Sequence, residues 1–292
     1  MTETLTPPID QPAMELCGVV REFGRRRILQ DVSLAAPRGE TLVIIGESGC
    51  GKSVTTKVMA GLLQPSAGEV LWDGRSLQQR TRRELHQDRL RLGYLFQGGA
   101  LFDSLSVLEN VAFGLRENTR LKEAEIRTIV VERLREVGLP AETASQRPAD
   151  LSGGMRKRVA LARALAMSPD IIFYDEPTTG LDPVMSDVIN ELILQTQQQR
   201  SVTSIVVTHD MHTVRRVAGS GGNAVPAGPV TSKSPHDRFS RTADELFACE
   251  DARAFVRERR REPAFENWRR HKTEDRGSQR HSQRCCGQPG RS

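Results

Sequence analysis

The sequence has no uninterrupted apolar stretch of the about 18 residues that a membrane-spanning helix requires. Its start, residues 1–12, is polar and contains proline, so we expect no secretory signal there. Only five cysteines are present, and this odd number, with one inside a glycine-rich segment, favours a reducing compartment over a disulfide framework. The composition therefore argues against a membrane-embedded or disulfide-stabilised protein.

The chain also lacks a strong excess of one charge. Its formal net charge of +5 is modest, and the carboxyl end is basic. Such an end suits an anionic membrane surface, although ordinary solvated charge is the alternative that we favour. We expect no nucleic-acid partner. The 292 residues are enough for a full α/β core with a smaller helical lobe.

A phosphate-binding loop is the clearest motif that is present. Residues 46–53 fit the pattern G-x-x-x-x-G-K-[ST]. They follow an apolar run at 41–45 that predicts a buried parallel strand, and they precede a helix predicted at 53–63. Glycines allow the tight turn in which backbone N–H groups and the helix N-terminus face an anion. The residues expected to contact a nucleotide here are Gly46, Glu47, Ser48, Gly49, Cys50, Gly51, Lys52, Ser53 and Val54.

Two side chains of this loop have specific expected roles. Lys52 would reach the β- and γ-phosphates, and the Ser53 hydroxyl would take one position on Mg²⁺. An ordinary glycine-rich turn before a helix is the alternative. The order of strand, loop and helix favours the phosphate-binding interpretation.

A second apolar run, at 171–174, ends in two acidic residues. Asp175 would emerge at the carboxyl edge of a parallel sheet, where it can hold Mg²⁺ directly or through water. Glu176 can then point at the attacking water, as a general base or a water positioner. Solvated acid pairs are common, so this interpretation depends on the phosphate loop of a neighbouring strand.

Two further polar residues follow predicted strands. His209 comes after the run at 202–207, and we interpret it as a sensor of the γ-phosphate, with a neutral surface histidine as the alternative. Gln97 follows the run at 92–96, and its amide can accept from water on Mg²⁺ and donate to phosphate. We expect His209, Asp175 and the phosphate loop to converge on one crevice.

The segment at 151–155 reads Leu-Ser-Gly-Gly-Met and precedes a helix predicted over 155–166. The dipole and the backbone N–H groups at the start of such a helix can bind a γ-phosphate through Ser152, Gly153 and Gly154. An ordinary serine N-cap with two glycines is the alternative, and the segment taken alone would favour it.

Together these motifs resemble the ATP-binding-cassette (ABC) family over roughly residues 14–218. The resemblance implies an α/β P-loop fold, with a mainly parallel sheet, antiparallel edge strands and a helical signature subdomain. It implies a head-to-tail homodimer or pseudo-dimer that hydrolyses ATP, with Mg²⁺, between the phosphate loop of one subunit and Ser152–Gly154 of the other. It also implies nucleotide contacts from Asp182 and from Phe23, which would stack on adenine. A core or surface phenylalanine is the alternative for Phe23.

A finer resemblance concerns the cargo. The stretches 96–113 and 176–184, together with Met155, look like ATPases of the lipid-importer branch, which serves the Mla system and Mce proteins. This resemblance implies a phospholipid or another hydrophobic cargo, a separate multi-pass membrane permease, and a lipid-binding substrate protein. The implied location is peripheral, on the cytoplasmic side of the inner membrane. An ABC ATPase for another cargo, such as an amino acid or a drug, and a soluble ABC protein outside transport are the alternatives.

The resemblance also predicts how the chain is organised. Residues 14–218 form the ATPase domain, and 76–150 within it are mainly helical and face the membrane partner. Residues 242–256 resemble the family's terminal helix. The basic tail at 257–292 has few apolar residues, so we expect it to be disordered.

Residues 219–241 do not fit this organisation. The family continues with strands, whereas 219–235 are rich in glycine and proline and show no strand periodicity. A functional insertion is one interpretation, although long structureless loops are uncommon in compact domains. Compensating frameshifts are the sharper hypothesis, because permitted codons for 219–226, read one base later, encode Asp-Arg-Val-Ala-Met-Leu-Tyr. The nucleotide sequence tests this, since codons that cannot yield that string exclude it.

Overall fold

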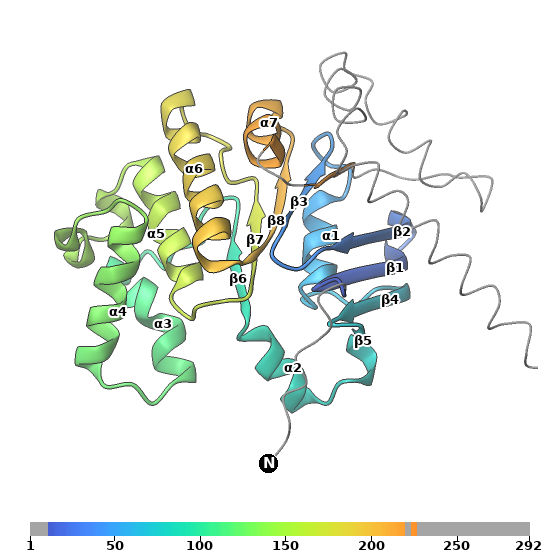
Figure 1. Cartoon of the computed structure of the whole chain (residues 1–292), viewed down its shortest axis with the longest axis horizontal. Coiled ribbons are helices and arrows are strands. Elements are labelled where there is room, and N and C mark those ends of the chain that lie inside the picture. Colours follow the sequence, from blue (N-terminus) through green and yellow to red (C-terminus); the bar gives the residue numbers. More distant parts are fainter. Residues whose placement is uncertain (1–10, 220–222, 227–292) are drawn as a thin grey trace, which may run out of the picture. The chain divides into compact units, whose positions relative to one another are not determined.

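The computed structural model describes residues 11–219 and 223–226, which lie in one of two compact units of the chain, residues 1–238 (Figure 1). The expectations for 242–256 and 257–292 fall outside the described residues, as does most of 219–241.

Two sheets form the frame of the described residues (Figure 1). The parallel sheet has the order β6-β7-β8-β3-β9, and the antiparallel sheet has the order β2-β1-β4-β5. The parallel strands are β3 (Thr41–Ile45), β6 (Leu92–Leu95), β7 (Ile171–Asp175), β8 (Thr203–Thr208) and β9 (Asn223–Pro226). The antiparallel strands are β1 (Met14–Phe23), β2 (Arg26–Ala36), β4 (Ala67–Trp72) and β5 (Arg75–Ser76). The predicted combination of a parallel sheet and antiparallel strands is confirmed.

Helices cover the parallel sheet and form a separate lobe. The α-helices are α1 (Lys52–Met59), α2 (Arg82–Arg89), α3 (Val107–Asn118), α4 (Glu123–Glu136), α5 (Gly153–Leu165), α6 (Pro183–Arg200) and α7 (Met211–Gly219). The 3₁₀ helices are η1 (Leu77–Gln79), η2 (Ala141–Ser145) and η3 (Pro148–Asp150). Helices α3, α4 and α5 pack on one another, and α5 also packs on β6. The stretch 76–150 therefore contributes β6 to the parallel sheet as well as α3 and α4 to the lobe.

One cluster of buried apolar residues joins the two sheets through α1. It includes Leu16 of β1, Met59 of α1 and Ile205 of β8, all almost completely buried. Every residue of β7 and β8 is buried, as expected for strands covered by helices on both faces. Buried strands of this kind fix the positions at which their carboxyl ends present polar side chains.

Helix α1 ends earlier than the sequence predicted. The prediction ran over 53–63, whereas α1 ends at Met59. Gly61 adopts φ +65°, and its N–H donates to the Val58 carbonyl at 3.0 Å. A glycine in the left-handed region commonly closes a helix, because it has no Cβ to oppose that conformation.

The prediction that no strand forms over 219–235 is wrong for residues 223–226. Strand β9 pairs in parallel with β3, from Leu42 opposite Asn223 to Ile45 opposite Pro226. Strand pairing uses backbone N–H and C=O groups, so it does not require alternating side chains. This segment is also where the shifted reading frame would encode apolar residues, and the frameshift hypothesis stays a prediction.

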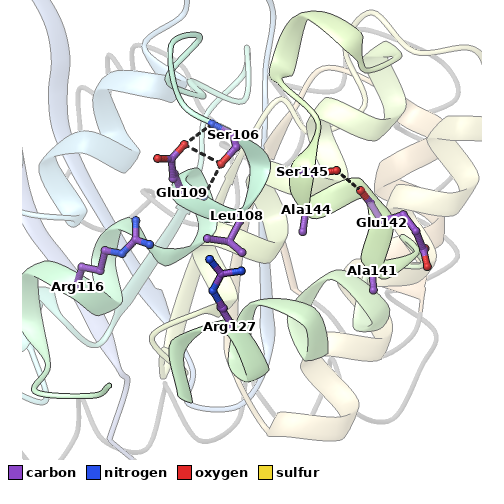
Figure 2. Close-up of a pocket in the computed structure, with 9 residues that line it drawn as sticks. All are labelled: Ser106, Leu108, Glu109, Arg116, Arg127, Ala141, Glu142, Ala144 and Ser145. Carbon is purple, nitrogen blue, oxygen red and sulfur yellow. Dashed lines mark hydrogen bonds between the residues drawn. The ribbon is translucent and has the colours of Figure 1, made fainter. Parts of the chain in front are cut away.

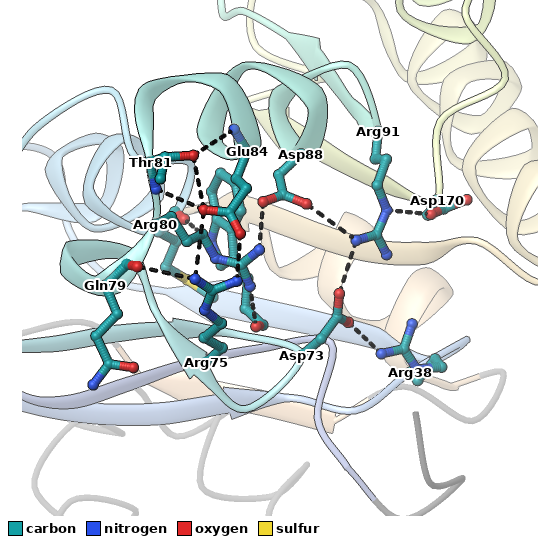
Figure 3. A network of polar contacts seen from close by, with 12 residues as sticks. Arg38, Asp73, Arg75, Gln79, Arg80, Thr81, Glu84, Asp88, Arg91 and Asp170 are labelled. Carbon is teal, nitrogen blue, oxygen red and sulfur yellow. Dashed lines mark hydrogen bonds and ion pairs between the residues drawn. The ribbon is translucent and has the colours of Figure 1, made fainter. Parts of the chain in front are cut away.

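A polar network links the two sheets (Figure 3). Asp73, in the turn between β4 and β5, accepts hydrogen bonds from Arg38 and, at 2.8 Å, from Arg91. Arg91 precedes β6 and also donates to Asp170, just before β7, at 2.7 Å. Burial raises the pKa of Asp73, but hydrogen bonds and charge from Arg91 and Arg38 outweigh it and hold that pKa below 3.8. The Arg91 guanidinium thus joins the antiparallel sheet to the parallel one.

Candidate active site

The phosphate loop connects β3 to α1. Gly51 precedes α1 with φ +102°, and no side chain caps the first N–H groups of this helix. A Cβ placed on Gly49, at φ +83°, would meet no atom within 4 Å, so the loop borders open space. An uncapped helix N-terminus beside open space fits a bound phosphate group.

Lys52 is folded into this loop. Its side chain is only 5% exposed, and its Nζ donates to the carbonyls of Gly46 at 2.7 Å and Glu47 at 2.9 Å. The same nitrogen lies 3.4 Å from Oε1 of Glu176. The loop and the acidic end of β7 therefore share one ammonium group.

Ser53 and Asp175 are in direct contact. The Ser53 hydroxyl donates to Oδ1 of Asp175 at 2.9 Å. The pKa of Asp175 lies above its ordinary value, because burial raises it more than the hydrogen bond from Ser53 and the charges of Lys57 and Lys52 lower it. Among residues 11–219 and 223–226 no group of three or more His, Cys, Asp or Glu residues could hold a metal ion. One hydroxyl and one carboxylate fit Mg²⁺, which completes its shell with phosphate and water oxygens.

Glu176 is the most constrained residue of the site. Its backbone adopts φ +51°, and its N–H donates to the Val207 carbonyl of β8 at 2.9 Å. Nδ1 of His209 lies 2.8 Å from Oε2 of Glu176, and Thr179 donates to the same oxygen at 3.0 Å. Burial raises the pKa of Glu176, but the contacts with His209 and Thr179 and the charge of Lys52 outweigh this and lower it. The carboxylate therefore lies between a lysine and a histidine.

The structure thus brings together most of the residues predicted from the ends of strands. Lys52, Ser53, Asp175, Glu176 and His209 form a continuous set of contacts where β3, β7 and β8 end. The phosphate loop, the acidic end of β7 and His209 therefore lie together, as expected, while a crevice between them stays a prediction. Their roles toward a nucleotide stay predictions.

Gln97 and Phe23 are placed differently from that set. Gln97 is held through its backbone, since its carbonyl accepts a hydrogen bond from Lys157, while its side chain is exposed. Phe23, at the end of β1, is 45% exposed, and the Arg21 guanidinium lies 4.6 Å from its ring centroid. This excludes the core alternative for Phe23. Stacking on adenine stays a prediction.

The segment Ser152–Gly154 caps α5 and packs on α6 of the same copy. The Ser152 hydroxyl accepts from the N–H of Met155 at 3.3 Å, and a Cβ on Gly154 would lie 2.5 Å from Cε of Met185. Asp182 caps α6, accepting from the N–H of Met185 at 3.0 Å. Both polar residues thus have a structural role as N-caps. Their contacts with nucleotide stay predictions.

Two residues that contact Glu176 were missed in the sequence. The Thr179 hydroxyl donates to the Glu176 carboxylate, and Lys157 donates a hydrogen bond to the Glu176 backbone carbonyl at 3.2 Å. Thr179 lies three positions after Glu176 and could have been found from that spacing. Lys157 could not have been found from the sequence, because a lysine inside a helix gives no signal that its side chain is buried.

These observations define a phosphate-loop nucleotide-binding protein of the α/β class. A family model described as ABC transporter matches residues 29–179, about half of the chain. The chain belongs to this ABC transporter family, as its resemblance predicted.

Curated relatives extend this similarity. The chain is 45% identical over 210 residues to the Probable ribonucleotide transport ATP-binding protein mkl of Mycobacterium leprae, covering 72% of this chain and 60% of that protein. The chain therefore spans less than two thirds of that relative. It is 43% identical over 210 residues to the Intermembrane phospholipid transport system ATP-binding protein MlaF of Haemophilus influenzae, covering 72% of this chain and 79% of that protein.

A solved structure has the same fold. The ATP-binding cassette MJ0796, a dimer in a post-hydrolysis state bound to ADP and Pi, superposes with a TM-score of 0.66 at 32% identity. The match covers 74% of this chain and 94% of that one. In the described part of this chain, no helix combines the length and apolar character needed to cross a membrane.

Proposed function

We propose that this chain is the ATP-hydrolysing subunit of an ABC transporter and works as a head-to-tail pair with a second copy. The observation that carries the proposal is the set of contacts among Lys52, Ser53, Asp175, Glu176 and His209. The dimer bound to ADP and Pi, with which this fold superposes, supports both hydrolysis and pairing.

The phosphate loop would hold the ATP phosphates. Lys52 would exchange its carbonyl partners and Glu176 for β- and γ-phosphate oxygens, since an ammonium binds an anion more strongly than a neutral carbonyl. Ser53, Asp175 and the Gln97 side chain would hold Mg²⁺, which neutralises developing charge on the phosphates. Phe23, exposed at the end of β1, is available to stack on adenine.

Glu176 would activate or orient the attacking water. Its lowered pKa keeps it ionised at neutral pH, so it can accept a proton or a hydrogen bond from water. When Lys52 moves to the phosphates, Glu176 loses a nearby positive charge, and its pKa rises toward the range of an effective base. His209, 53% exposed beside Glu176, would contact the γ-phosphate.

The second copy would complete each site. Ser152, Gly153 and Gly154 begin α5, whose N-terminus carries a partial positive charge suited to a γ-phosphate. Ser152 and Gly153 are exposed, so they can meet a partner copy. Asp182 caps the adjacent α6 and would lie beside the same nucleotide.

The power stroke would act on a separate multi-pass permease, and the cargo would be a phospholipid or another hydrophobic molecule. The relative named for intermembrane phospholipid transport supports this cargo. The helical lobe offers the contact surface: a cavity of about 460 Å³ lies between α3, α4 and η2 (Figure 2). Nearby in sequence, Phe102 and Phe113 are each 44% exposed, with ring centroids 5.0 Å apart. Peripheral attachment on the cytoplasmic side of the inner membrane follows, with a lipid-binding substrate protein as a further partner.

A second cargo class has specific support. The Mycobacterium leprae relative is named for ribonucleotide transport, so an ABC ATPase subunit that drives transport of another cargo is the alternative. The permease that copurifies with the full chain, and the molecules bound to it, distinguish the two. Absence of any membrane protein in the purified complex would overturn transport and favour a soluble ABC protein.

Hydrolysis itself is tested by turnover. The wild-type chain should release phosphate from MgATP, and Glu176→Gln should slow release by about 100-fold or more, the usual contribution of a general base. ATP binding should survive, because Glu176 does not hold the phosphates. Wild-type turnover in the Glu176→Gln variant would refute the assignment of Glu176.

A further inference from the structure

Helix α5 carries a buried positive charge that the mechanism above does not use. The side chain of Lys157 is within the interior, with the residue only 6% exposed. Burial lowers the pKa of Lys157, although the charges of Asp175 and Glu176 oppose that shift. Burying an ammonium group costs several kcal/mol unless it is well satisfied, so its partners matter.

Those partners are two backbone carbonyls at the site. Lys157 Nζ donates to the carbonyl of Gln97, after β6, and to the carbonyl of Glu176, after β7, at 3.2 Å. One ammonium therefore bridges the ends of two neighbouring strands. Neither contact is with a side chain, so Lys157 fixes the main chain rather than a rotamer.

The backbone of Glu176 needs such support. Its φ of +51° lies in the left-handed region, which is unfavourable for a residue with a Cβ and persists only where surrounding contacts hold it. Its N–H is held by Val207 and its carbonyl by Lys157. The direction of the Glu176 side chain follows from this backbone.

The same helix also holds the segment after Gln97. Arg163 donates to the carbonyls of Gly99 at 2.8 Å and Ala100 at 2.6 Å. Lys157, on the same helix, contacts both Gln97, at the start of the segment 97–100, and Glu176. Displacement of the 97–100 segment would pull on the same ammonium that holds Glu176.

We propose that Lys157 is a positioning residue for ATP hydrolysis, which holds the backbone of Glu176 in the orientation that the attacking water requires. This role rests on the proposed function. It separates two tasks of α5: the N-terminus at Ser152–Gly154 would serve the nucleotide of the partner copy, and Lys157 would serve the acid of its own copy.

The test is a split between turnover and binding in the full chain. Lys157→Met keeps the length of the side chain and removes its charge and donor. We expect kcat to fall roughly 10- to 100-fold, as when a reacting group is displaced by about 1 Å. KM for ATP and ATP-driven dimerisation should stay within about 3-fold of wild type, because Lys157 itself contacts no nucleotide and the contacts of Lys52, Ser53 and Asp175 are retained.

Arg158→Met is the matched control. Arg158 is the next residue of α5, and it donates to the Gly138 carbonyl at 2.9 Å in the helical lobe, away from the site. Its kcat should stay within about 2-fold of wild type. If Lys157→Met does not fold by circular dichroism, Lys157→Leu replaces it, since an apolar side chain likewise removes the charge and the donor and should lower kcat in the same direction.

Three results would overturn the proposal. These are a kcat of the Lys157 variant within about 2-fold of wild type, an equal fall in Arg158→Met, or loss of dimerisation in parallel with kcat. The last would place the effect at the helix N-terminus. A wild-type chain that hydrolyses no ATP would instead refute the proposed function, and this inference with it.

Discussion

Arg91→Met tests the link between the two sheets. Arg91 contributes a hydrogen bond to Asp73, whose side chain is 20% exposed, and one to Asp170, whose side chain is 55% exposed. A hydrogen bond to a charged group contributes about 1.5 kcal/mol when shielded, and an exposed ion pair about 0.5 kcal/mol. We therefore expect a loss of about 2 kcal/mol, equivalent to a fall in Tm of about 4–8 °C for a domain of this size.

Thermal unfolding by circular dichroism measures this fall, with Arg83→Met as the control, because Arg83 is exposed on α2. Asp73 has a folded pKa below 3.8, so its stabilising effect is present above that pH and is lost as pH falls through the folded value. The difference in Tm between wild type and Arg91→Met should therefore be constant near neutrality and shrink below about pH 4. A Tm for Arg91→Met within about 1 °C of the Arg83→Met control at pH 7 would refute the network's contribution.

Two further substitutions probe the nucleotide site. Lys52→Ala should weaken binding of a fluorescent ATP analogue by at least about 10-fold, because a charge-assisted contact with phosphate is lost; an unchanged Kd would contradict the role of Lys52. Gly154→Ala puts a Cβ 2.5 Å from Cε of Met185. Since that methionine end is flexible, the free energy of unfolding should change by less than about 1 kcal/mol. ATP-driven dimerisation should fall, because the partner's nucleotide is proposed to lie against Gly154. Normal dimerisation would show that close contact between Gly154 and that nucleotide is unimportant.

The sequence was most informative where a motif and its strand or helix lie together. The phosphate loop, the acidic end of β7 and His209 after β8 each follow a recognisable apolar run, and parallel strands bring such ends to one edge. Their convergence was therefore predictable, whereas the direct contact of His209 with Glu176 was seen only in the structure.

Contacts between distant segments were not predictable in this way. The Asp73–Arg91 pair and the carbonyl partners of Lys157 depend on how two sheets and a helix lobe pack, which no local pattern records. The end of α1 depends on the conformation of Gly61, and β9 forms by backbone pairing with β3 despite its glycine- and proline-rich surroundings. Backbone-driven features leave little trace in side-chain periodicity.

The sharing of each ATP by two copies is the feature on which the proposed mechanism depends. Its most direct test is the molecular mass of purified Glu176→Gln by light scattering, with MgATP and without nucleotide. We expect a monomer without nucleotide and a dimer with MgATP. Adding Ser152→Arg to this variant should restore the monomer by blocking the partner's nucleotide. A Glu176→Gln chain that binds ATP yet stays monomeric, or a dimer indifferent to Ser152→Arg, would contradict this sharing.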